Sequence, residues 1–111
     1  MISAATAEHY TWANVCDGWH LVKGDALSVI QERMPPGASE QRHYHERARQ
    51  FFFILRGEAT MEIGGKLVTL REREGIEVAP GVAHTMMNRS AGDVEFLVVS
   101  APRAHGDRIA A

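Results

Sequence analysis

The segment that determines the fold reads Gly37-Ala38-Ser39-Glu40-Gln41-Arg42-His43-Tyr44-His45. On an extended strand, His43 and His45 point to the same face, and a rise of about 3.3 Å per residue separates their Cα atoms by roughly 6.5–7 Å. Two imidazoles at that separation can bind one ion. A third, His84, lies in a later strand-like stretch, residues 83–88. Because histidine is the commonest neutral nitrogen ligand of transition metals, we expect the fold to bring His84 to this pair.

Length and composition predict one globular domain, residues 1–111, with 45% apolar and 23% charged residues. A net charge of −2 without any run of Lys or Arg argues against nucleic acid as a partner and leaves small molecules open. The single cysteine, Cys16, permits no internal disulfide, so a reducing, cytoplasmic location is expected. The chain has neither an apolar run of about 20 residues nor a secretory signal, so no membrane partner is predicted.

Short β-prone stretches separated by turn residues predict an all-β barrel or sandwich, since no stretch shows a helical period with caps. The expected strands cover 9–11, 19–22, 26–34, 49–55, 58–63, 66–70, 76–79, 83–88 and 94–100. The unbroken apolar run within 49–55 indicates burial on both faces of that strand. We place the barrel core at about 19–101, between an N-terminal arm (1–8) and an irregular C-terminal tail (102–111).

At the histidine residues the sequence resembles the cupin superfamily. The first motif of that family consists of a glycine, His-x-His, an acidic residue and a second glycine at fixed spacings. Its spacings are matched by Gly37, His43, His45, Gln50 and Gly57, with Gln50 at the acidic position. Its second motif is matched from the proline onward, by Pro80-Gly81, His84 and Asn88, with Gly75 closer to the proline than usual. The resemblance covers about Leu27–Val99, and the two motifs together are specific.

This resemblance implies a small single-domain cupin with a double-stranded β-helix, a jelly-roll-like barrel, that forms a homodimer. It also implies one divalent transition metal ion (iron, nickel, manganese, zinc or copper) bound by His43, His45 and His84. Gln50 stands where the family usually has Glu, and it either binds the ion or makes a hydrogen bond behind the ligands. A neutral ligand set leaves the charge of the ion uncompensated and favours an anionic ligand, and an amide cannot serve as general base.

Strand parity extends the site to a predicted pocket wall. Phe52 and Ile54 share the parity of Gln50, and Met86 and Asn88 share that of His84, so these four are expected to line the pocket. The strand 31–33 is expected to cross the barrel beside it, where one of its residues could orient an anionic substrate, although most charged residues are simply solvated. The remaining histidines, His9, His20 and His105, are not predicted to be ligands.

We therefore predict a metal-dependent enzyme, of the dioxygenase or the lyase/isomerase type, acting on a small molecule and favouring an anion. A non-catalytic module that binds or senses a small molecule is the alternative, favoured by the missing general base at position 50. A structural protein with a vestigial site is the third possibility. The fold alone does not choose among them, because this fold hosts many chemistries.

Overall fold

A computed structural model of the chain describes residues 1–104 and 106–111, and the described residues contain eleven strands and no helix. The strands are β1 (Glu8–Trp12), β2 (Cys16–Lys23), β3 (Ser28–Met34), β4 (His43–His45), β5 (Arg49–Arg56), β6 (Ala59–Ile63), β7 (Lys66–Leu70), β8 (Gly75–Val78), β9 (His84–Met87), β10 (Val94–Ala101) and β11 (Arg108–Ala110). The all-β prediction is confirmed. A membrane-spanning helix is accordingly absent from the part of the chain described.

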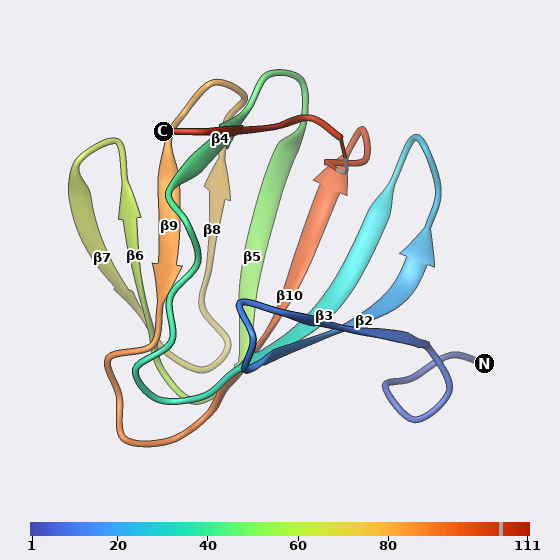
Figure 1. Ribbon diagram of the computed structural model, residues 1–111, viewed down its shortest axis with the longest axis horizontal. Helices are drawn as coiled ribbons and strands as arrows, with labels where there is room; N and C mark the ends of the chain where they lie inside the picture. Colours follow the sequence, from blue (N-terminus) through green and yellow to red (C-terminus); the bar gives the residue numbers. More distant parts are fainter. Residues whose placement is uncertain (105) are drawn as a thin grey trace.

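The strands form two antiparallel sheets that face each other (Figure 1). One sheet has the order β1-β2-β3-β10-β5-β8, and the other has the order β11-β4-β9-β6-β7. From β3 to β11 the chain changes sheet at every connection except the hairpin between β6 and β7. This alternation is the predicted double-stranded β-helix, and it pairs strands that are distant in the sequence, such as β3 with β10 and β4 with β9.

One apolar core fills the space between the sheets. Alternate residues of β10 are buried, which is the period expected for a strand with one face inward. The core consists of Cys16, Met34, Phe52, Ile54, Ala59, Met61, Leu70, Val78, Met86, Val94, Phe96 and Val98. A single continuous core agrees with a single domain.

The predicted burial of both faces of β5 is wrong. Only alternate residues of β5 are buried, while Phe51 on the outer face is 42% exposed. Phe51 and Phe53 stack on each other there, with ring centroids 6.1 Å apart. The apolar run misleads because Phe51, on the outer face of the six-stranded sheet at this strand, is left exposed by the described part of the chain.

The irregular tail predicted for 102–111 is also wrong at its end. Arg108–Ala110 forms β11, which pairs with β4 in the register Arg108↔His45 and Ala110↔His43. A three-residue strand is too short to show an alternating pattern, so the sequence gives no local signal for it. At the other end, β1 begins at Glu8, so the sheets extend beyond the expected core range of 19–101 at both ends.

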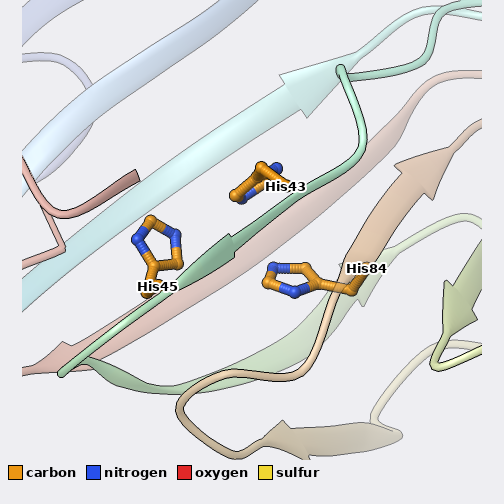
Figure 2. A group of neighbouring side chains, drawn as sticks. All are labelled: His43, His45 and His84. Atoms are coloured by element: carbon orange, nitrogen blue, oxygen red, sulfur yellow. The ribbon is translucent and has the colours of Figure 1, made fainter. Parts of the chain in front are cut away.

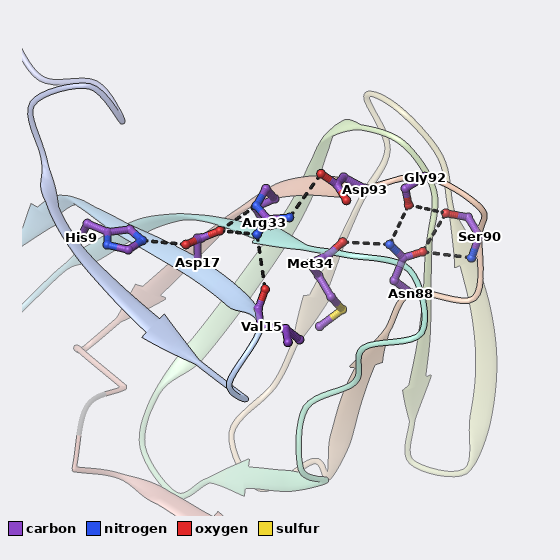
Figure 3. A network of polar contacts seen from close by, with 9 residues as sticks. All are labelled: His9, Val15, Asp17, Arg33, Met34, Asn88, Ser90, Gly92 and Asp93. Carbon is purple, nitrogen blue, oxygen red and sulfur yellow. Dashed lines mark hydrogen bonds and ion pairs between the residues drawn. The ribbon is translucent and has the colours of Figure 1, made fainter.

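Hydrogen bonds and ion pairs hold the strand ends together near the start of β10 (Figure 3). The Arg33 guanidinium donates to Asp17 at 2.7 Å and to Asp93 at 3.2 Å, which ties β2 and β3 to the turn before β10. The Asn88 amide donates to the carbonyls of Met34 and Gly92, both at 2.8 Å. Asn88 follows β9 directly, so these bonds fix the end of the strand that carries His84.

The two glycines of the first motif differ in their surroundings, and that difference can be measured. Gly37 and Gly57 have positive φ values of 82° and 84°, but a Cβ at Gly57 would overlap the carbonyl of Asp93, whereas nothing lies near one at Gly37. Gly37→Ala should lower the free energy of unfolding by about 1–2 kcal/mol, the cost of a left-handed backbone. Gly57→Ala should cost about 1–3 kcal/mol more. Urea denaturation of the two variants checks this, and equal losses would contradict it.

Candidate metal centre

Two strands of the five-stranded sheet bring the three motif histidines together. His43 and His84 lie directly opposite each other where β4 pairs with β9, and His45 follows on the same face of β4. Figure 2 shows the three imidazoles around a common space. One nitrogen from each ring lies within 4.8 Å of the others, and the side chains are 4%, 6% and 1% exposed. Strand parity therefore does bring His43, His45 and His84 into one cluster.

Backbone carbonyls orient two of the rings. His43 Nδ1 lies 2.8 Å from the Gln41 carbonyl and His84 Nδ1 lies 3.0 Å from the Val82 carbonyl. A carbonyl only accepts, so each Nδ1 carries the proton and donates it, which leaves the Nε2 lone pair free. Burial lowers the pKa of His43 to about 4, and burial also lowers the pKa of His45 and of His84. The three rings are therefore neutral at pH 7, the state in which imidazole binds a metal.

Gln50 lies beside the histidines on β5. Its Nε2 donates to Ser100 Oγ at 3.1 Å across the β5–β10 pair, and the side chain is 6% exposed. Among the described residues, its Oε1 has no hydrogen-bond partner, and the same is true of His45 Nδ1 and His84 Nε2. Buried polar atoms without partners are costly and call for an explanation.

A transition metal ion fits this set of donors. Bonds of about 2.1 Å place two nitrogen ligands of one ion at most about 4.2 Å apart, so the three nitrogens need only a modest closing of the rings. Neutral imidazole suits zinc, copper, iron and nickel, and the unpartnered atoms are lone-pair donors that an ion would satisfy.

A cavity of about 540 Å³ opens beside the cluster. His43, His45 and Gln50 line it, while His84 lies behind His43 with the two ring centroids 4.5 Å apart. The other polar or charged side chains along it are those of Glu8, Tyr10, His20, Lys23, Ser28, Glu32, Glu40, Ser100, Arg103 and Arg108. The cavity is therefore a mixed polar pocket with histidines on one side.

The four predicted wall residues lie in different surroundings. Phe52 lines the cavity, with its ring 5.8 Å from that of His84. Ile54 and Met86 point inward but are fully buried in the apolar core, because the barrel is filled beyond Phe52. Asn88 is buried in the turn network of Figure 3, where Ser90 donates to its Oδ1. Strand parity correctly predicts which side chains point inward, but it does not predict how deep the cavity reaches.

Several cavity residues were not individually predicted from the sequence. Glu32 lies on the strand expected beside the site, one residue of which was predicted to be able to orient an anionic substrate, and Glu32 is the residue of that strand section that lines the cavity. Tyr10, Glu40 and Arg108 carry no such signal, because pairings distant in the sequence bring them to the cavity. Of the other histidines, His20 also lines the cavity, His9 contacts Asp17 at 2.7 Å, and His105 lies outside the described residues.

The C-terminal strand is anchored beside the histidines by Asp107. Its carboxylate accepts from the backbone N–H groups of Glu46, Arg47 and Ala48 at 3.2, 2.9 and 2.9 Å. Those donors, chiefly Arg47 and Ala48, hold the pKa of Asp107 below its usual range. The next residue, Arg108, lies opposite His45 and donates to the Gln41 carbonyl at 3.2 Å. Asp107 thereby holds a cationic side chain at the cavity.

Comparison with known proteins agrees with the sequence motifs. The profile of the cupin domain family matches residues 30–100. An oxalate-binding protein of Thermotoga maritima is 33% identical over 85 residues, which cover 72% of this chain and 70% of that protein.

Two solved structures share the fold. A predicted oxalate decarboxylase of Thermotoga maritima superimposes with a TM-score of 0.84 at 23% identity, covering 93% of this chain and 99% of that one. KdgF from Halomonas gives 0.83 at 16% identity, with coverages of 91% and 93%. At these identities the two structures establish a common fold and nothing about activity.

Removal of the Asp107 carboxylate should release β11. In Asp107→Ala, the amides of Arg108–Ala110 should exchange with deuterium several-fold faster than in the wild type, as hydrogen-exchange mass spectrometry can measure. Because the folded pKa is lowered, the anchor is complete at neutral pH, and its contribution is lost as the pH falls below the usual Asp range. Asp25→Ala is the matched control, since Asp25 is exposed and its carboxylate pairs with Arg103 at 3.7 Å. Unchanged exchange in Asp107→Ala would contradict the anchoring role.

Proposed function

This chain belongs to the cupin domain family, and from that membership and its histidine cluster we propose that it binds one divalent transition metal ion and, at that ion, a small carboxylate anion. His43, His45 and His84 would hold the ion, with Gln50 Oε1 as a fourth donor. The observation that carries the proposal is the set of three neutral, buried histidines beside a cavity of about 540 Å³.

The neutrality of the donor set supports an anion as the ligand. No carboxylate is proposed among the donors, so the full charge of the ion remains to attract an anion and to polarise its oxygen atoms. Ser100 holds the Gln50 amide so that Oε1 is the atom left without a partner. The Gln41 and Val82 carbonyls hold two rings in the tautomer that leaves Nε2 available.

The similarity to a known protein and the properties of the cavity both support a carboxylate as the ligand. The curated relative is named an oxalate-binding protein, and the 540 Å³ of the cavity suits a small molecule. Lys23, Arg103 and Arg108 line the same cavity and can pair with the negative charge of a carboxylate. Arg108 is the best placed of the three, because β11 pairs with the strand that carries His43 and His45.

An enzymatic reaction of the lyase/isomerase or dioxygenase type on the same anion is the second candidate. The observation that favours it is the presence of Glu32 and Glu40 in the cavity, since these carboxyl groups can exchange protons with a bound molecule where Gln50 cannot. Turnover assays with oxalate under air and under nitrogen separate the two types from each other and from simple binding.

A homodimer in a reducing compartment completes the proposal. The stacked rings of Phe51 and Phe53 offer an apolar outer face for a second copy, which sedimentation velocity can test. Cys16 is fully buried and burial raises the pKa of its thiol to about 11, so it suits neither disulfide exchange nor nucleophilic chemistry.

Loss of one histidine should abolish metal binding. Protein purified without chelator or nickel resin should contain close to one ion per chain, and His43→Ala, His45→Ala and His84→Ala should each lose most of it. His9→Ala is the matched control, because His9 is a half-exposed histidine on β1 that pairs with Asp17. Elemental analysis is the measurement. Retention of the ion in all three variants would show that the cluster is not the site.

Introduction of a carboxylate at position 50 should weaken anion binding. Gln50→Glu adds a negative charge at the ion, so the Kd for oxalate should rise about tenfold or more, equivalent to about 1.4 kcal/mol. Gln31→Glu, the same change on the outward-facing neighbour of Glu32 in β3, should leave the Kd unchanged. Isothermal titration calorimetry of the metal-loaded proteins decides. Equal affinities for wild type and Gln50→Glu would mean that Gln50 does not reach the ion.

A further inference from the structure

One part of the cavity wall is acidic, and simple binding of an anion at the histidines does not account for it. Glu32 from β3 and Glu40 from the segment between β3 and β4 line the same cavity as His43, His45 and Gln50. Two ionised carboxylates would repel a carboxylate ligand, so their presence needs a reason.

Glu32 is held in place from across a neighbouring strand. Tyr10 on β1 lies opposite Gly18 on β2, and Gly18 lies opposite Glu32 on β3. The Tyr10 ring crosses the space where a side chain at position 18 would be, since a Cβ there would overlap the ring. Its hydroxyl donates to Glu32 Oε2 at 3.3 Å. The absence of a side chain at Gly18 thus allows a tyrosine two strands away to position the carboxyl group.

Glu40 is held by the strand that carries His84. Its Oε1 accepts from the Met86 N–H at 2.9 Å, and its own N–H donates to the Met86 carbonyl at 3.0 Å. Thr85 Oγ1 also donates to the Glu40 carbonyl, at 2.8 Å. Both carboxyl groups are therefore positioned by hydrogen bonds rather than left mobile on the surface.

The surroundings favour a proton on this pair at neutral pH. Burial, followed by the negative charge of Glu40, raises the pKa of Glu32 to about 8, against the opposing effects of the Tyr10 hydroxyl and Arg108. Burial raises the pKa of Glu40 to about 7, opposed by the Met86 N–H and Arg108. The other titratable or charged groups that face the pair are Cys16 and His20 from β2, Lys23, Glu8, Arg103 and the histidines of the cluster.

We propose that Glu32 and Glu40 are the proton-binding wall of the anion site, so that a carboxylate ligand enters together with a proton. This inference rests on the proposed function. In the step, an ionised carboxylate of the pair takes a proton from the acid form of the buffer: the bond between the buffer and the proton breaks, the O–H bond of the carboxyl group forms, and the conjugate base of the buffer is released to solvent. The new O–H donates a hydrogen bond to an oxygen of the bound anion. No electron transfer is involved. The charge of the wall thus falls when the charge of the ligand arrives.

Proton uptake can be measured directly, without any turnover. Oxalate is titrated into the metal-loaded protein by calorimetry in two buffers of different ionisation enthalpy, from roughly pH 6 to 9, a range that brackets ordinary shifts of a buried carboxyl group. The wild type should take up protons as it binds, most strongly near the upper pKa of the pair. Coupling to one proton makes the Kd rise about tenfold per pH unit above that pKa.

The variants distinguish proton uptake by the acidic wall from a pH dependence that arises at the ion. Glu32→Gln keeps the size of the side chain, and it should lose most of the uptake and flatten the rise of the Kd with pH. A pH dependence that arises at the ion itself would persist in this variant. Glu77→Gln, an exposed acid on β8 paired with Arg49, is the matched control and should behave as the wild type. Tyr10→Phe removes a bond that favours the ionised form of Glu32, so its uptake should shift to higher pH and provides an independent check should Glu32→Gln fold poorly.

Each outcome decides a different claim. Oxalate binding with equal proton uptake in wild type, Glu32→Gln and Tyr10→Phe would overturn the role of the wall and leave the proposed function intact. Absence of oxalate binding by the metal-loaded wild type would overturn both. Uptake that is lost in Glu32→Gln but not in Glu77→Gln would support both.

Discussion

The site depends on the antiparallel register between the segment 37–45 and the segment 81–88. The Gly37 N–H donates to the Asn88 carbonyl at 2.8 Å, the Glu40 N–H donates to the Met86 carbonyl at 3.0 Å, and the Gly81 N–H donates to the His45 carbonyl at 2.7 Å. His43 and His84 are opposed within this ladder. A slip of one residue would turn the His84 imidazole to the other face of the sheet. The spacing of both motifs is thus a requirement of the register, and it explains why a Pro-Gly turn precedes His84.

The register also places polar atoms where the core would otherwise be apolar. His45 Nδ1, Gln50 Oε1 and His84 Nε2 are buried without a partner among the described residues, and each such atom costs about 1–3 kcal/mol. The core must therefore supply the stability of the fold, which it does with large buried side chains such as Met34, Met61 and Phe96. These three unpartnered atoms lie together at the histidine cluster, and places where local rules of polar satisfaction are broken are where function is expected.

The sequence could predict what is set by spacing and period. The parity of His43 and His45, the turn residues between the β-prone stretches and the spacing of the two motifs are local features, and from them the all-β fold and the family could be predicted. It could not predict β11 or the contribution of Glu40 and Arg108 to the cavity, because these depend on pairing between segments distant in the chain. The exposure of Phe51 was missed for a related reason: an apolar run does not reveal whether a second layer covers it.

The replacement of an acidic ligand by Gln50 and the acidic wall formed by Glu32 and Glu40 are best understood together. A carboxylate bound to an ion is held ionised by the ion, so it can lower the charge of the centre but cannot readily carry a proton. A carboxyl group on a different wall of the cavity, half-buried and anchored by Tyr10 or Met86, can carry one. Under the proposed function, an acidic group on the wall in place of the ligand position would leave the ion with its full attraction for an anion. It would also place a proton beside a bound anion, which the amide of Gln50 could not supply.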